Sequence, residues 1–201
     1  MTNLVTRLMV SQVLLCGLLA ACGFPLPPPD EIGFVGGRIV DSLEIAQLRG
    51  YHGSDGDILE VQVSTATDLV SYRGQYDTSV SAEAFFCDMP GKLEINMNPS
   101  VYWLGLGDVM AVSLYPEPDA DYVRARDRIA GKGHFIFVVF INLSGSFRGY
   151  PYVEYNIRRE PGDLCLRLNG GSIALGRAFE SNLVHISREE IRKIVARRRL
   201  L

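Results

Sequence analysis

The sequence predicts a mainly β protein, an antiparallel β-sandwich or partly open barrel that ends in a C-terminal α-helix. Short apolar runs with two-residue alternation recur from about residue 33, and clusters of Gly, Pro, Asn and Asp separate them. Helical spacing of apolar residues becomes clear only at the C-terminal end. With 201 residues and 47% hydrophobic content, the chain suits one such domain, which we place at 33–201.

Short apolar runs are the candidate strands. The run 135–141 (Phe-Ile-Phe-Val-Val-Phe-Ile) is apolar at every position, which predicts a central strand buried on both faces. In 92–97 the apolar residues alternate strictly, so this strand should turn one face to the core and the other to water. The candidate strands are 36–42, 58–64, 69–73, 80–87, 92–97, 109–115, 134–143, 152–158, 164–168 and 172–175.

Turn-forming residues separate these runs. Pro161-Gly162 and Asn169-Gly170 each lie between two candidate strands, so we expect two tight connections and a continuous meander over 152–175. The charged segment 120–130 predicts a short helix or a loop that crosses the end of the sheet.

The last element is a helix at about 187–199. Ser187 is a suitable N-cap residue, and Glu190 three positions later completes a capping box. Ile191, Ile194 and Val195 form an apolar stripe at helical spacing, which should pack on the sheet.

An arginine run closes this helix. Arg197, Arg198 and Arg199 lie at its negative end, where the helix dipole favours cations. The dipole is a sufficient structural reason for the run. The same cations are also a candidate interaction surface for anionic lipid headgroups, cell-wall polymer or a partner protein.

A second candidate interaction surface comprises three tyrosines, Tyr150, Tyr152 and Tyr155. Aromatic side chains are enriched at interfaces and at sugar-binding surfaces. The alternative is ordinary packing, because alternating aromatic residues on a strand also serve a core or an edge.

The N-terminus differs in composition from the rest of the chain. A polar stretch with one cation, Arg7, precedes an apolar run at 8–19, which is shorter than the ~20 residues that span a bilayer. This arrangement is typical of a cleaved signal peptide over 1–21. The run ends in Leu19-Ala20-Ala21-Cys22, which resembles the lipobox of bacterial lipoproteins.

The resemblance implies a specific modification. It implies that diacylglycerol is attached to the thiol of Cys22, that the chain is cut after Ala21, and that the mature protein is anchored to a membrane of the bacterial envelope. No Asp follows Cys22, which favours the periplasmic face of the outer membrane over the inner membrane. The alternatives are an ordinary secretory signal cut nearby, with Cys22 a plain thiol, or an uncleaved anchor.

A proline-rich stretch follows Cys22. Four of the residues at 25–29 are proline, which favours an extended polyproline II conformation. We expect 22–32 to be a lipidated, stiff tether that lifts the domain off the lipid surface. The alternatives are a loop packed against its own domain and a polyproline ligand for an aromatic groove.

Two cysteines, Cys87 and Cys165, remain in the domain once Cys16 is removed and Cys22 is lipidated. Two thiols in an oxidising compartment are a natural disulfide pair, and two reduced buried thiols are the alternative. If the bridge joined facing sheets, the architecture would resemble that of immunoglobulin-like domains. Neither thiol lies in a CxxC pair, which argues against a thiol oxidoreductase.

Patterns for catalysis and for metal binding are weak. His52, His134 and His185 stand far apart, and neither HExxH nor GxSxG nor a phosphate-binding glycine loop occurs. Asp55 and Asp57 are candidate calcium ligands, but they lack EF-hand spacing, so a polar turn is the better interpretation. The sequence thus predicts neither cofactor nor metal.

The net charge of −3 argues against a nucleic-acid-binding protein, which normally carries a basic face. The resulting hypothesis is a lipid-anchored envelope protein that acts as a non-enzymatic binding or assembly module for an envelope protein or glycan. The alternative is an envelope hydrolase with a dispersed active site.

Overall fold

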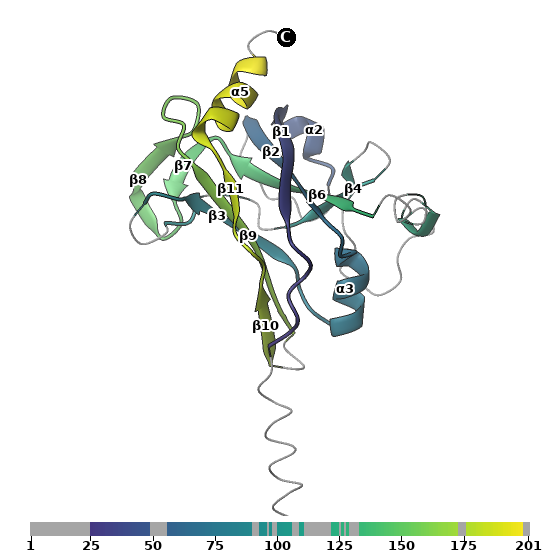
Figure 1. Cartoon of the computed structure of the whole chain (residues 1–201). Coiled ribbons are helices and arrows are strands. Elements are labelled where there is room, and N and C mark those ends of the chain that lie inside the picture. Colours follow the sequence, from purple (N-terminus) through teal and green to yellow (C-terminus); the bar gives the residue numbers. More distant parts are fainter. Residues whose placement is uncertain are drawn as a thin grey trace, which may run out of the picture.

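The fold consists of antiparallel sheets with an open edge and a C-terminal helix (Figure 1). The computed structural model describes residues 25–48, 56–89, 93–95, 97, 100–105, 109–110, 122–124, 126, 128, 133–172 and 176–198. The larger sheet has the order β1-β2-β6-β4-β5, in which all pairs are antiparallel. Its strands are β1 (Gly33–Asp41), β2 (Asp57–Thr65), β6 (Phe135–Asn142), β4 (Tyr102–Leu104) and β5 (Val109–Met110).

The second sheet is built around one long strand, β9 (Leu164–Ser172). One edge of β9 pairs with β3 (Ser81–Phe86), and the other edge pairs with β11 (Val184–Ile186) and then β10 (Arg177–Glu180). A separate hairpin is formed by β7 (Ser144–Phe147) and β8 (Tyr150–Asn156). The inner faces of both sheets contribute to one hydrophobic core, so the predicted mainly β, sandwich-like fold with a C-terminal helix is confirmed.

The predicted central strand is β6, and it is buried on both faces. Phe137 and Val139 point into the main core between the sheets. Val138 and Phe140 point to the opposite face, where Ile45 of the short helix α2 (Ser42–Ile45) covers them. A strand whose side chains are apolar at every position is therefore one that is covered on its outer face as well.

The predicted C-terminal helix is α5 (Arg188–Arg198). The amide of Glu190 donates to Oγ of Ser187 at 3.3 Å, and the amide of Ser187 donates to Oε2 of Glu190 at 3.0 Å, so the capping box is confirmed. Ile191 and Ile194 are buried, as their spacing predicts.

Residues 69–73 were expected to form a strand, and this prediction is wrong. They begin the helix α3 (Leu69–Tyr76), whose N-cap is Asp68. Oδ1 of Asp68 accepts hydrogen bonds from the amides of Val70 and Ser71 at 3.1 and 3.3 Å. A run of five residues is too short to separate the two periodicities, and the cap decides between them.

The expected strand at 92–97 and the expected 152–175 meander also need correction. Glu94 and Met97 form isolated bridges only, with Phe85 and Ile141 respectively.

After Pro161-Gly162 the chain changes sheets, because β8 pairs with β7 whereas β9 pairs with β3, β10 and β11. Asn169-Gly170 lies within β9 rather than in a turn. In the segment 120–130, residues 122–124, 126 and 128 are helical.

A buried tyrosine couples helix α3 to the core. The hydroxyl of Tyr122 donates to Oδ1 of Asp68, and its ring lies edge-on to Trp103 with centroids 4.9 Å apart. Burial, and then the hydrogen bond to the Asp68 carboxylate, raise the pKa of Tyr122 far above its ordinary value. The N-cap of α3 and the core are thus joined through one phenol.

This raised pKa makes stability fall at high pH. A folded pKa above the unfolded value of about 10 means that the stabilisation is complete below pH 10 and is lost as the pH rises through the folded pKa. We expect Tyr122→Phe to lower the free energy of unfolding at pH 7 by about 1–2 kcal/mol, because a hydrogen bond to a charged acceptor is lost. Above pH 10 the difference should shrink. Urea unfolding of both proteins from pH 7 to 11 checks this, and a constant difference would contradict it.

Within the part of the chain that the structure describes, none of the helices has the length and apolar character needed to cross a membrane.

Candidate functional site

The C-terminal helix is fixed to the fold by an ion-pair junction at Asp57. Nη2 of Arg198 lies 2.8 Å from Oδ1 of Asp57, and the other carboxylate oxygen pairs with Arg158. Nη1 of Arg198 also donates to the carbonyl of Ile39 at 3.2 Å. Asp57 thus connects the start of β2, the segment after β8 and the end of α5. Both carboxylate oxygens of Asp57, a candidate calcium ligand, are therefore paired with arginines. Asp55, the other candidate, lies outside the described residues.

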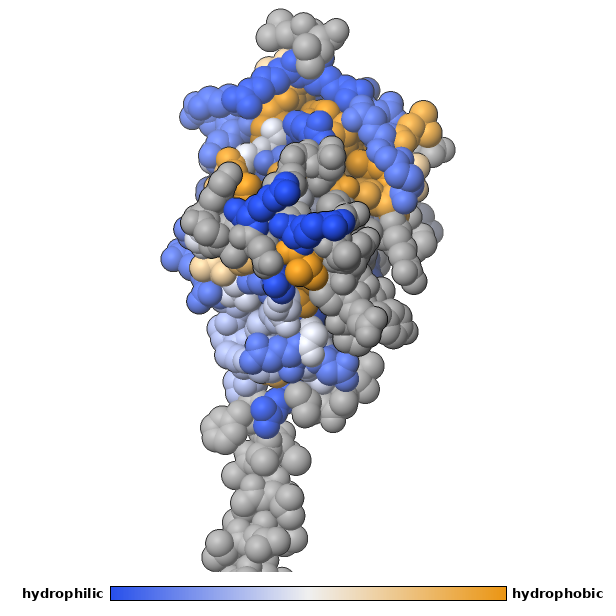
Figure 2. All heavy atoms as spheres, turned by 90° about the vertical axis from the view of Figure 1, so that its right-hand side faces the viewer, coloured by the Kyte–Doolittle hydropathy of each residue, from blue (hydrophilic) through white to orange (hydrophobic). Residues whose placement is uncertain are grey.

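One groove, here called the β1 groove, runs between α5 and β1. It has a volume of about 550 Å³ and an apolar floor that includes Ile39 and Ile194. Three arginines border it, Arg38, Arg197 and Arg198, against one carboxylate, Glu44. Figure 2 shows apolar surface framed by hydrophilic residues at the end of the molecule that carries α5.

Arg38 is held at this groove by a buried acid. Its Nε and Nη2 lie 3.0 and 2.9 Å from Oε2 of Glu60, a residue that is fully buried. Gln62 donates to the other carboxylate oxygen at 2.8 Å. The hydrogen bond that Arg38 donates to the Glu60 carboxylate is the main reason that the pKa of Arg38 is raised. The guanidinium is therefore a fixed, permanently charged group at the edge of the groove.

A second groove, here called the β9 groove, lies on the other side of α5, beside the β8–β9 connection. It has a volume of about 380 Å³ and adjoins a smaller hollow of about 270 Å³. Arg159 and Arg192 line both parts, and Arg188 lines the larger part. The larger part also carries carboxylates, Asp88, Glu154 and Glu160, whereas no acid lines the smaller one.

The side chains of four of these arginines form no ion pair with any described residue. Within the described chain, no carboxylate lies within ion-pair distance of the exposed side chains of Arg159, Arg188, Arg192 and Arg197. Sequence reasoning pointed to Arg197 but missed the other three. Arg188 and Arg192 are four residues apart on the predicted helix, and that spacing was the available signal.

The arginine run at 197–199 divides accordingly. Arg198 holds the helix in place, whereas Arg197 faces the β1 groove. Arg199 lies outside the described residues.

The three tyrosines do not share one surface. Tyr150 and Tyr152 are exposed, the latter at 97% of its surface, and Val153 beside them is 42% exposed. Tyr155 is 7% exposed and packs against Phe147 and Phe86 with ring centroids 5.4 and 6.2 Å apart. Its inclusion in a surface is therefore corrected: Tyr155 is a core residue on the inner side of β8.

The histidines are separated in the structure as in the sequence. His134 is exposed, and His52 lies outside the described residues. Nε2 of His185 lies 3.8 Å from Oδ2 of Asp163, too far for a hydrogen bond, and both side chains are exposed. In the described ranges no cluster of three or more His, Cys, Asp or Glu is arranged to hold a metal. The alternative of an envelope hydrolase stays a prediction.

The predicted disulfide between Cys87 and Cys165 is present, with Cα atoms 5.1 Å apart. Cys165 lies on β9, opposite Phe85 of β3, and the amide of Cys87 continues the same ladder by donating to the carbonyl of Asp163 at 2.9 Å. The bridge therefore links neighbouring strands of one sheet. An immunoglobulin-like bridge between facing sheets is not what this structure contains.

The proline-rich segment is docked onto the domain. The amide of Leu26 donates to the carbonyl of Ala178 at 3.1 Å, and Leu26 is 2% exposed between Tyr72 and Phe179. The hydroxyl of Tyr72 donates to the carbonyl of Pro27 at 2.7 Å. From Leu26 onward the expected free tether is therefore part of the fold. Cys22 itself lies outside the described residues.

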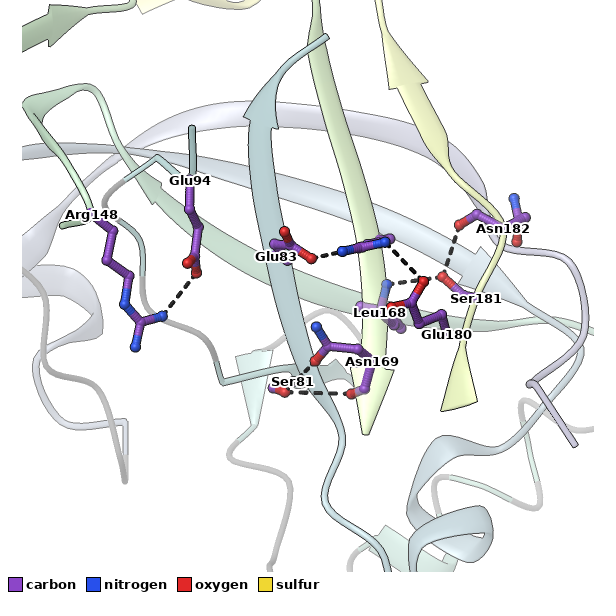
Figure 3. A network of polar contacts seen from close by, with 10 residues as sticks. Ser81, Glu83, Glu94, Arg148, Leu168, Asn169, Glu180, Ser181 and Asn182 are labelled. Atoms are coloured by element: carbon purple, nitrogen blue, oxygen red, sulfur yellow. Dashed lines mark hydrogen bonds and ion pairs between the residues drawn. The ribbon is translucent and has the colours of Figure 1, made fainter. Parts of the chain in front are cut away.

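Asn182 fixes the next part of the same segment. Its side chain accepts from the amide of Ile32 at 2.8 Å and donates to the carbonyl of Ile32 at 2.9 Å. Asn182 belongs to a polar network around β9 (Figure 3), in which its carbonyl accepts from the hydroxyl of Ser181. Beside it, Arg167 of β9 bridges Glu83 and Glu180. These contacts give residues 26–32 a defined path along the second sheet.

Comparison with known proteins gives no relative: no protein-family model, no curated protein and no solved structure matches this chain.

Proposed function

We propose that this chain is a lipid-anchored protein of the bacterial envelope whose domain is a non-enzymatic binding or assembly module. The proposed location of the anchor is the periplasmic face of the outer membrane. The observation that carries the proposal is the lipobox-like Leu19-Ala20-Ala21-Cys22 directly ahead of the docked segment. A disulfide in the domain supports export, because such bridges persist in oxidising compartments.

The grooves beside α5 are the proposed binding surface. Their exposed arginines project from a helix that packs on the core and from a tight connection, so binding needs little ordering of the backbone. Guanidinium groups bind carboxylates and phosphates in bidentate fashion. The proposed partner is therefore an envelope protein or glycan that presents acidic groups to Arg159, Arg188, Arg192 and Arg197.

The anchor is tested by intact mass of the protein extracted from membranes. We expect a chain that begins at Cys22 and carries the mass of two or three acyl chains. Cys22→Ser should abolish this mass and leave the chain uncut, because lipid attachment to the thiol precedes cleavage in the lipobox class; the intact mass should then include residues 1–21. An unmodified Cys22, or a Cys22→Ser protein that still carries acyl mass, would contradict the proposal.

The binding surface is tested by a photo-crosslinking amino acid placed at position 192 and, as a matched control, at position 193. Both positions are exposed and adjacent on α5, but only Arg192 lines a groove. We expect discrete adducts from position 192 in growing cells, and their loss when Arg159 is also changed to Ala. Equal adducts from both positions, or no adduct from position 192, would contradict the proposal that the grooves bind a partner.

A further inference from the structure

We infer that the end of the domain formed by β10 and the docked segment at Leu26 lies against the lipid bilayer, with α5 and its grooves turned away from it. The inference rests on the proposed lipidation of Cys22. The surface that contacts this end of the domain is the lipid bilayer. The length of chain between the lipid and the first fixed residue determines this contact.

Leu26 is the first firmly held residue. It pairs through its amide with Ala178 of β10, and its side chain fills a small cluster with Tyr72 and Phe179, whose rings lie edge-on to each other with centroids 5.3 Å apart. Pro27 is held in addition by Tyr72. Pulling the segment off would expose this cluster and break both hydrogen bonds, so the docked state is favoured.

The remaining chain is short. Four residue steps separate Cys22 from Leu26, and a fully extended chain covers at most about 14 Å over that number. The radius of gyration of a domain of this size is about 15 Å. The tether is thus no longer than the radius of the domain that it holds. The docked end of the domain therefore stays within about 14 Å of the lipid, and the opposite end cannot turn toward the bilayer.

The orientation then follows from the fold. Figure 1 shows β10 and α5 at opposite ends of the molecule. With β10 at the lipid, the β1 and β9 grooves open away from the membrane, where a partner in solution or in the cell wall can reach them. The same short connection that excludes a raised domain therefore presents the proposed binding surface.

The chemistry near Leu26 suits a headgroup region without demanding a particular lipid. Half-buried Tyr76 lies beside buried Tyr72 with tilted rings and centroids 4.8 Å apart, and tyrosine is favoured where an apolar body meets a polar layer. Arg73 and Asp77 lie at the C-terminal end of α3, and Arg177 and Glu180 lie on β10, so this end carries both signs of charge. We therefore expect contact to be imposed by the tether, and to be the same on zwitterionic and on anionic bilayers.

The test uses the full lipidated protein in vesicles of phosphatidylcholine that contain a lipid with a nitroxide quencher near the headgroup. Ala178→Trp, with exposed Gln75→Trp as a second reporter, places a fluorophore at the inferred contact, and exposed Tyr152→Trp is the distal control. The native, buried Trp103 is a common background. We expect at least threefold stronger quenching of the new tryptophan at 178 than at 152, with position 75 also above the control.

A flexible insertion distinguishes tethering from intrinsic affinity. Twenty Gly and Ser residues placed between Phe24 and Pro25 should reduce the quenching at 178 to the level of the control, because the leash becomes longer than the domain radius. Equal quenching at 178 and 152 in a protein whose mass shows acylation would overturn the inference. Strong quenching that persists after the insertion would overturn it as well. Absence of acyl mass would instead refute the proposed function.

Discussion

Replacing both Cys87 and Cys165 by alanine is expected to lower the free energy of unfolding by about 4 kcal/mol. The two residues are 78 positions apart, and closing a loop of that size removes about this much entropy from the unfolded chain. Such a loss is a large part of the 5–15 kcal/mol that typically stabilises a domain. Urea unfolding of the double variant, made in a protein that begins at residue 23 and so lacks Cys16 and Cys22, measures the effect.

Two comparisons make this prediction specific. The parent protein unfolded with a reducing agent should match the double variant to within about 1 kcal/mol, because both lack the same constraint. A loss below about 1 kcal/mol in both would mean that the unfolded chain is already restrained elsewhere, and the entropic account would fail. Since the bridge also ties the end of β3 to β9, reduction should first increase hydrogen exchange around 85–87.

The second large effect is expected at Gly170. An added Cβ there would lie 2.0 Å from the backbone oxygen of Ser79 and 2.5 Å from the ring of Phe179. A backbone carbonyl cannot move aside as a flexible side chain can, so we expect Gly170→Ala to cost about 3 kcal/mol or more. Because Phe179 also packs against Leu26, the docking of the N-terminal segment should weaken in the same variant.

Matched glycine variants separate crowding from other effects of the substitution. Gly171→Ala meets Arg177 backbone oxygen at 3.3 Å, a contact that a small shift relieves, and should cost less than about 1 kcal/mol. Gly74→Ala lies within α3 with nothing inside 4 Å and should stabilise by about 0.5–1 kcal/mol, since alanine is the better helix former. Equal unfolding midpoints for the variants at 170 and 171 would show that crowding at Ser79 is not the cause.

Gly170 also explains why one sequence prediction failed. Asn-Gly between two apolar runs is a strong local turn signal. In this fold β9 continues through it, and glycine is needed because Ser79, just before β3, and Phe179 of β10 approach closely. The local signal and the tertiary requirement select the same residue for different reasons.

Several features were predictable because they depend on neighbours in the chain. The capping box at Ser187 and the stripe with Ile191 are contacts within one helix, so spacing alone determines them. The all-apolar run that forms β6 reports burial on both faces, whichever elements provide the cover. The Cys87–Cys165 pair followed from elimination, although not the fact that it lies within one sheet.

The sequence by itself determined that the chain is mainly β with a capped C-terminal helix and a single disulfide pair, because periodicity, capping and cysteine count are local or compositional properties. Only the tertiary structure decided that 26–32 is docked, that Tyr155 is buried, and that Arg159 and Arg192 share a groove. Each of these depends on contacts between segments far apart in sequence, such as Leu26 with Ala178. No local pattern encodes which distant surface a segment will meet.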